Sequence, residues 1–119
     1  MEKSNIAIGQ MFIQFPQPIS DNQEKPMPRV WVKVANKVLG HHYGEDKEEV
    51  SLFVDNNALV QSSINPNYCI GIRDKWNITD RYYGECVRKG MFVPITDLRE
   101  ADGVCDEIGW PKYEVDLGF

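Results

Sequence analysis

The sequence is short of the features that mark membrane proteins and nucleotide-dependent enzymes. Its 119 residues contain no apolar run that approaches the roughly 20 residues of a membrane-spanning helix. Residues 1–10 have neither the basic segment nor the long apolar segment of a signal peptide. No phosphate-binding loop, dinucleotide-binding fingerprint, nucleophile elbow or calcium loop occurs. We therefore expect a soluble, cytoplasmic protein without a cofactor, folded as a single domain over residues 1–119.

Histidine is scarce as well, because the chain contains only His41 and His42. They are followed directly by Tyr43, Gly44, Glu45 and Asp46. Adjacent histidines on a strand point to opposite faces, and neither of the common zinc spacings is present. The hexamer is typical of a polar loop, so we predict no catalytic residue and no metal site. A small enzyme that uses His41 and His42 is the third of three functional hypotheses.

The three cysteines, Cys69, Cys86 and Cys105, are an odd number at long and irregular spacings. This pattern favours reduced thiols in a cytosol over a disulfide framework. Each cysteine falls at an apolar position of an expected strand or helix. We therefore predict that all three pack in the core as small hydrophobic residues.

Basic residues are outnumbered, with 13 Lys and Arg against 18 Asp and Glu, which gives a net charge of −5. The acids concentrate in residues 45–70 and 97–119, and the bases slightly exceed them elsewhere. General binding to duplex DNA depends on Lys and Arg at phosphates, so the balance argues against it. An acidic total is compatible with a partner protein that has a basic surface.

Short segments with strand-like apolar patterns predict a series of β-strands. They are residues 11–15, 29–34, 50–54, 68–73, 82–87, 91–95 and 113–117. The segments between 68 and 95 form an antiparallel meander in this interpretation. Residues 58–62 fit either a hairpin strand or a short helix capped by Asp55. Residues 16–28 contain four of the seven prolines and predict a surface loop.

One helix is expected, over residues 97–108. Asp97 and Glu100 have the spacing of a capping box, which satisfies free backbone amides at the start of a helix. Leu98, Ala101, Cys105 and Ile108 form an apolar stripe, and Gly109 and Pro111 follow as stop signals. The predicted fold class is α+β, with this late helix packed on a curved antiparallel sheet or small barrel-like sheet.

The segment 71–90 holds eight charged and three aromatic side chains in twenty positions. In the meander it contains a hairpin loop over residues 74–81, with Trp76 at the tip. An exposed tryptophan beside arginines is typical of an interface centre, and it can also stack on unpaired bases. A second hypothesis is thus a barrel that binds single-stranded nucleic acid or a small ligand. The face it predicts contains Arg73, Lys75, Trp76, Arg81, Tyr82, Tyr83, Arg88 and Lys89.

The leading hypothesis is a small acidic protein-binding module that is not an enzyme. Inhibitors, immunity proteins and phage counter-defence proteins that block a basic partner have this size and charge. A homodimer is compatible with the sequence. The predicted contact residues are Glu45, Asp46, Glu48, Glu49, Trp76, Glu100, Asp102, Asp106 and Glu107.

Overall fold

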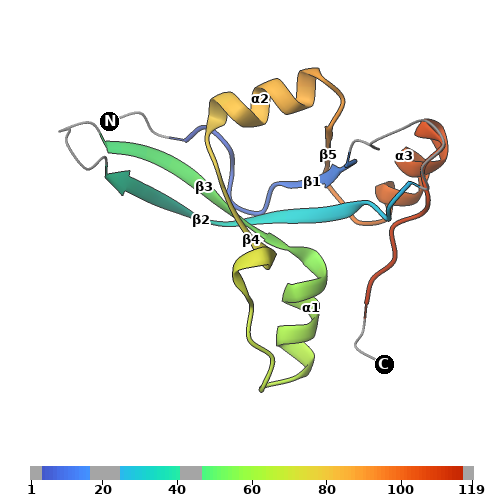
Figure 1. The fold of residues 1–119 in the computed structure, drawn as a ribbon, viewed down its shortest axis with the longest axis horizontal. Helices are drawn as coiled ribbons and strands as arrows, with labels where there is room; N and C mark the ends of the chain where they lie inside the picture. Colours follow the sequence, from blue (N-terminus) through green and yellow to red (C-terminus); the bar gives the residue numbers. More distant parts are fainter. Residues whose placement is uncertain (1–3, 17–24, 41–46, 117–119) are drawn as a thin grey trace.

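The computed structural model describes residues 4–16, 25–40 and 47–116. A curled five-stranded antiparallel sheet forms its centre, in the order β4-β3-β2-β1-β5, and three helices surround it (Figure 1). The strands are β1 (Met11–Gln14), β2 (Arg29–Gly40), β3 (Lys47–Asp55), β4 (Lys75–Ile78) and β5 (Phe92–Ile95). The helices are α1 (Asn56–Ile64), α2 (Asp80–Arg88) and α3 (Glu100–Ile108), with a 3₁₀ turn, η1 (Ile72–Asp74), before β4. The predicted α+β fold on a curved antiparallel sheet is confirmed.

Successive residues of a strand point to opposite sides of the sheet. Each face therefore has its own cluster of buried side chains. On one side α2 covers an aromatic cluster, and on the other α3 covers a mainly aliphatic one. The α2-side cluster contains Phe12, Trp31, Phe53, Ile78, Cys86 and Phe92. The α3-side cluster contains Ile13, Phe15, Val30, Ile95, Ala101, Cys105 and Tyr113. Neighbours such as Phe12 and Ile13 therefore serve different clusters.

The predicted meander over residues 68–95 is wrong except for its last strand. Residues 82–87 lie in α2, residues 75–78 form a strand instead of a loop, and residues 68–71 are in neither a helix nor a strand. Thr79 caps α2, since its side chain accepts a hydrogen bond from the N–H of Tyr82 at 3.1 Å. Tyr83, Cys86 and Val87 then reach the core at helical spacing. The strand prediction rests only on the apolar character of residues 82–87, and the cap and the spacing decide for a helix.

The predicted late helix is confirmed, but it begins at Glu100 instead of Asp97, and its N-cap residue Arg99 makes no side-chain capping bond. The Glu100 carboxylate accepts hydrogen bonds from the N–H groups of Thr96 and Asp97, at 2.7 and 3.3 Å. Ala101 and Cys105 are buried under the sheet, whereas Ile108 is exposed. Gly109 ends the helix in the left-handed conformation, at φ 79°, which favours glycine.

The ambiguous segment after β3 is a helix. The Asp55 side chain accepts a hydrogen bond from the N–H of Asn57 at 2.8 Å and caps α1. The predicted last strand is not formed over residues 113–116, the described part of that segment. Instead, the buried Tyr113 hydroxyl accepts a hydrogen bond from Asn56 and donates one to Asn57, at 3.1 and 3.2 Å. This anchor holds the chain against α1 without a ladder of backbone hydrogen bonds.

A further expectation concerns the proline-rich segment, residues 16–28. The structure describes residues 16 and 25–28 of it, and none of these lies in a strand. The other residues of the predicted loop lie outside the described part of the chain. The indole N–H of Trp110 donates to the Pro26 carbonyl at 2.7 Å, so the segment packs beside the end of α3.

Cys86 and Cys105 are buried as predicted, but Cys69 is exposed. Cys69 lies in the segment that does not form the predicted strand.

Candidate interaction surfaces

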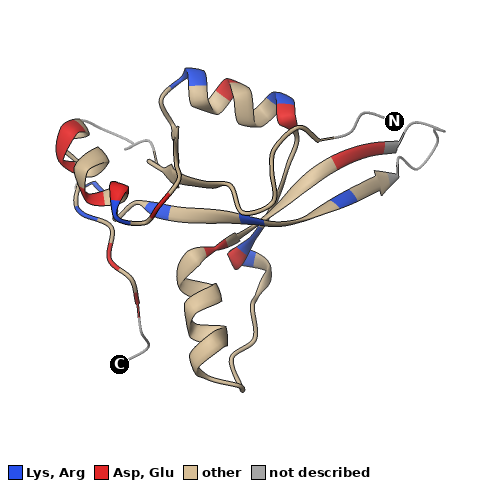
Figure 2. Cartoon of the chain, turned by 180° about the vertical axis from the view of Figure 1, so that it is seen from behind, with Lys and Arg blue, Asp and Glu red and all other residues tan. Residues whose placement is uncertain are grey.

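The acidic residues predicted to contact a partner lie in two separate regions, as their two sequence blocks suggest. Figure 2 shows the acidic part of α3 and the acidic part of β3 at opposite ends of the molecule. Asp102, Asp106 and Glu107 are exposed on α3, whereas Glu48 and Glu49 are half-buried in the β2–β3 hairpin. The predicted contact residues 45 and 46 and the two histidines at 41 and 42 lie outside the described residues.

Two of the acids at the start of α3 have structural partners. Hydrogen bonds from the backbone N–H groups of Thr96 and Asp97 hold the pKa of Glu100 below its ordinary value. The Arg99 side chain and N–H likewise lower the pKa of Asp97. Glu100 is therefore a capping residue first, and its carboxylate is less available to a partner than those of Asp102 and Asp106.

A projection that we call the arm, residues 56–74, consists of α1, the returning segment 65–71 and η1. Figure 1 shows it extending away from the sheet. None of the residues from Asn56 to Ile72 is charged, and the arm is correspondingly uncoloured in Figure 2 up to its base. Ile64 is 53% exposed and Ile72 is 92% exposed. The arm thus presents Ile64 at the end of α1 and Ile72 near its base to solvent, and no charged residue lies between Asn56 and Ile72.

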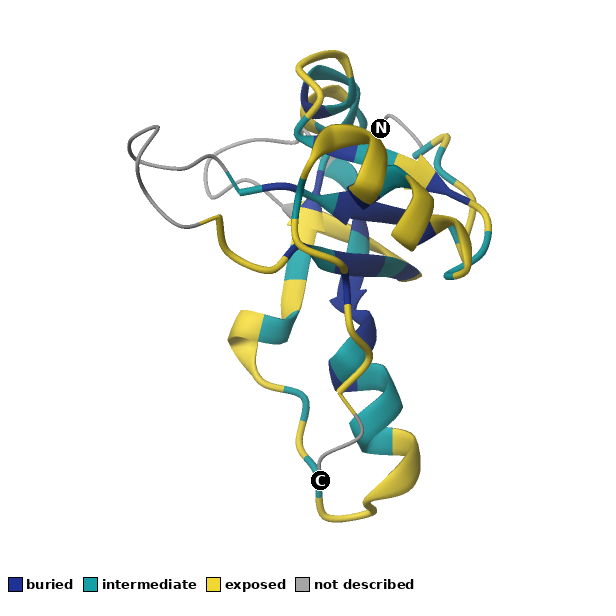
Figure 3. Cartoon of the chain, turned by 90° about the vertical axis from the view of Figure 1, so that its right-hand side faces the viewer, coloured by how far each residue is buried: buried dark blue, intermediate teal, exposed yellow. Residues whose placement is uncertain are grey.

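Polar contacts fix both ends of the arm at its base. Arg29 donates to the Arg73 carbonyl at 3.0 Å and pairs with Asp55 at 2.8 Å. At the other end, Asn57 donates to the Glu114 carbonyl at 3.2 Å and accepts from the Asp116 N–H at 2.8 Å. The chain after α3 therefore runs alongside α1, as Figure 3 shows. It brings two carboxylates, and the exposed Val115, to the side of the arm.

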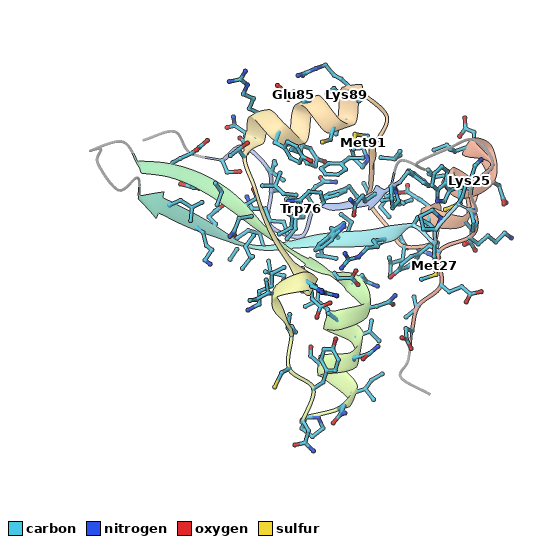
Figure 4. All side chains as sticks on the ribbon, viewed as in Figure 1. Lys25, Met27, Trp76, Glu85, Lys89 and Met91 are labelled. Carbon is cyan, nitrogen blue, oxygen red and sulfur yellow. The ribbon has the colours of Figure 1, made fainter. Side chains whose placement is uncertain are left out.

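Trp76 is not at the tip of a hairpin loop. It lies in β4, opposite Phe53 of β3, and Figure 4 shows it below α2 and over the sheet. Its ring is 5.3 Å from Trp31, 5.4 Å from Phe92 and 5.9 Å from Tyr82, measured between ring centroids. It is half-buried, so of the two alternatives for Trp76, projection from a loop tip and packing back over the sheet, the structure has the second.

The face predicted for nucleic acid is divided by the fold. Tyr83 stacks on Phe53 at 6.1 Å within the core and is no surface residue. Arg88 and Lys89 are exposed at the end of α2, and Figure 4 shows Lys89 and Glu85 on the outward side of that helix. The remaining members of that face are exposed or half-buried near the start of β4 and α2, namely Arg73, Lys75, Trp76, Arg81 and Tyr82.

A buried polar network near residue 4 was not predicted. Lys33 is only 1% exposed, and its ammonium donates to the Ile6 carbonyl at 2.6 Å and to Ser4 Oγ at 3.2 Å. Ser4 Oγ donates to Asp80 at 2.7 Å and lies 2.9 Å from Ser51 Oγ. Burial lowers the pKa of Lys33, and the charge of Asp80 opposes that shift. The signal available in the sequence was that Lys33 shares a strand face with Trp31.

This network joins the start of the described chain to β2, β3 and α2. The Ser4 hydroxyl also accepts from the N–H of Ile6 at 3.3 Å, so it is surrounded by partners. A serine beside a lysine can act as a nucleophile, but a hydroxyl engaged on all sides is a structural link. We assign the network to the stability of the fold.

The described residues contain no group of three or more His, Cys, Asp or Glu side chains placed to hold a metal ion. Within the same ranges, no helix has the length and apolar character needed to cross a membrane. No protein-family model, curated protein or solved structure matches this chain. The surfaces themselves therefore carry the argument about function.

Proposed function

We propose that this protein is a protein-binding module whose contact surface is the arm together with the chain beside it. The observation that carries the proposal is the exposure of Ile72 and Ile64 on a segment without charge. Large apolar side chains on a projecting, uncharged surface are typical of sites that another protein covers. The proposal keeps the binding function expected from the sequence and moves its centre from the acidic helix to the arm.

The arm projects from the body of the molecule. Among the described parts of the chain, the arm and the long β2–β3 hairpin extend from the sheet (Figure 1). A partner that covered the arm would bury the exposed Ile64 and Ile72.

The expected partner has an apolar patch bordered by Lys and Arg. Interfaces commonly have an apolar centre and a polar rim. Here Ile64 and Ile72 supply the apolar centre, and Glu114 and Asp116 give the rim a negative charge. A second copy of this chain would bring the same acids against each other, so we favour a different, basic protein. An enzyme that handles nucleic acid has such a surface, and blocking it would make this chain an inhibitor in a reducing, cytoplasmic compartment.

A photo-crosslinking residue placed at position 72 tests the proposal. We expect it to capture one protein from a lysate of the source organism, and the same residue at exposed position 81 on α2 to capture none. The captured protein is then purified and its affinity measured by calorimetry. Ile72→Asp should weaken binding about 30-fold, since a central hot-spot residue contributes about 2 kcal/mol or more.

Ile8→Asp is the matched control, because Ile8 is also exposed and lies in the segment before β1 rather than on the arm. It should leave the affinity unchanged, and a double Glu114→Lys and Asp116→Lys variant should weaken binding to a basic partner. Equal effects of the two Ile→Asp substitutions would overturn the assignment to the arm. A dimer of this chain that Ile72→Asp dissociates in sedimentation would show that the occupant is a second copy and not a basic partner.

A further inference from the structure

We infer that the surface formed by Arg29, Trp76 and Tyr82 binds a nucleobase together with its phosphate, from a free nucleotide or from a single-stranded nucleic acid. This surface lies at the edge of the α2-side cluster, and it meets the base of the arm at Arg73. Its tests use nucleic-acid probes and Tyr82 variants, so this inference can fail while the proposed protein contact holds, and the reverse.

Aromatic rings at this edge remain accessible. Tyr82 is 41% exposed although it contacts both Trp76 and Phe92, at 5.9 and 6.0 Å between ring centroids. The Cys86 thiol, one turn further along α2, raises the pKa of the Tyr82 hydroxyl. Trp76 is half-buried beside it and is held edge-on by Trp31. Two rings of fixed orientation at a surface provide a platform for the flat face of a base.

A guanidinium lies next to the platform in a fixed position. The Arg29 guanidinium carbon is 4.3 Å from the centre of the Trp31 ring, and its Nε donates to Asp55 at 2.8 Å. Its Nη2 donates to the Arg73 carbonyl at 3.0 Å, which brings the exposed Arg73 beside it. Trp31 is shared, because it contacts both Arg29 and Trp76. Arginine contacts phosphate through a planar set of donors, so a phosphate can follow a base stacked on Trp76 or Tyr82.

The charges around the platform favour an anion. Each of the three acids in the neighbouring sequence is already engaged: Asp74 accepts from the Gly71 N–H, Asp80 from Ser4, and Glu85 pairs with Arg81. Arg73 and Lys75 are exposed, and neither takes part in an ion pair among the described residues. Asp55, which pairs with Arg29, is engaged as well. Arg73 and Lys75 are thus the cations at the platform that can contact an anion.

Fluorescence anisotropy with a labelled oligothymidylate at low salt tests the inference. We expect saturable binding that weakens steeply as salt is added, because phosphate contacts release counterions. Competition with free thymidine monophosphate distinguishes a site for a free nucleotide from a site for a single strand. Full displacement at comparable concentration indicates a nucleotide site, and displacement only by unlabelled oligonucleotide indicates a strand site. Tyr82→Ala should weaken binding about tenfold, as expected for the loss of one stacked ring.

Tyr82→Leu keeps an apolar side chain on α2 if the alanine variant does not fold, and it should weaken binding similarly. Arg73→Ala is compared with Arg88→Ala, which removes the same charge from the far end of α2. Only the former should reduce affinity severalfold. The inference is overturned if neither probe binds, if Tyr82→Leu binds like the parent, or if the two arginine variants lose the same affinity.

Discussion

Helices α1 and α3 both contain nine residues, but they meet solvent in opposite ways. On α3, Ala101 and Cys105 face the sheet, and carboxylates cover the outer side. On α1 no residue is charged, and the helix has exposed Ile64 near its end. The charged outer face of α3 is typical of a helix that packs one side on the core and exposes the other to solvent. α1 has no such charged face, and the proposed protein contact would account for this difference.

The largest expected difference between the two regions is in stability. Ile13→Ala, in the α3-side core, should lower the free energy of unfolding by about 2–5 kcal/mol, since it leaves a cavity among packed side chains. Ile72→Ala, on the arm, should change it by less than about 0.5 kcal/mol. Urea unfolding followed by circular dichroism measures both. A comparable loss in the two variants would mean that the arm belongs to the core.

The second difference concerns pH. The pKa of Glu100 is below its ordinary value of 4.5, so near that pH the folded chain binds fewer protons than the unfolded chain. The stabilisation from Glu100 is therefore complete above about pH 4.5 and is lost as the pH falls through the lower folded value.

Unfolding experiments on Glu100→Gln should show a variant that is less stable than the parent at neutral pH. The gap should close in acid, as the parent loses its carboxylate. Ile72→Ala removes no ionisable group, so the gap between this variant and the parent should not change with pH. If the Glu100→Gln gap were constant down to the lowest pH, the cap at the start of α3 would not depend on the charge of Glu100.

The smallest expected effect is chemical. Cys69 on the arm is exposed, whereas Cys105 under α3 is buried, and burial raises the pKa of its thiol. Iodoacetamide should therefore add one group to the native protein, at Cys69, and three after unfolding. Mass spectrometry of the intact chain and its peptides counts and locates the groups. Rapid modification of Cys105 in the native state would show that α3 opens more readily than its packing implies.

The sequence was sufficient where local patterns agree with one another. The strands near residues 11–15, 29–34, 50–54 and 91–95 and the helix near 97–108 have apolar periodicity, turn residues and caps that favour the same structure. The apolar side chains of residues 82–87 are compatible with a strand or a helix. The helix forms because Thr79 caps it and because Tyr83 packs on Phe53 of the sheet. Neither contact can be read from the apolar pattern.

The surfaces were harder to predict than the strands, because they depend on which strands are neighbours. Trp76 is half-buried since β4 pairs with β3, opposite Phe53, rather than forming a loop. The lack of charge from Asn56 to Ile72 is visible in the sequence. It predicts an interior segment as readily as an exposed one, and the position of the arm outside the sheet decides the matter.

The contact between Lys33 and residues 4–6 has a consequence for cleavage of the chain near Ile6. The ammonium is enclosed, and a serine hydroxyl and a backbone carbonyl from the first turn of the described chain accept its hydrogen bonds. Trimming by an aminopeptidase past Ile6 would remove both acceptors and leave a charge inside the fold with fewer partners. Residues 4–6 thus stabilise a buried charge, although they lie in no helix or strand.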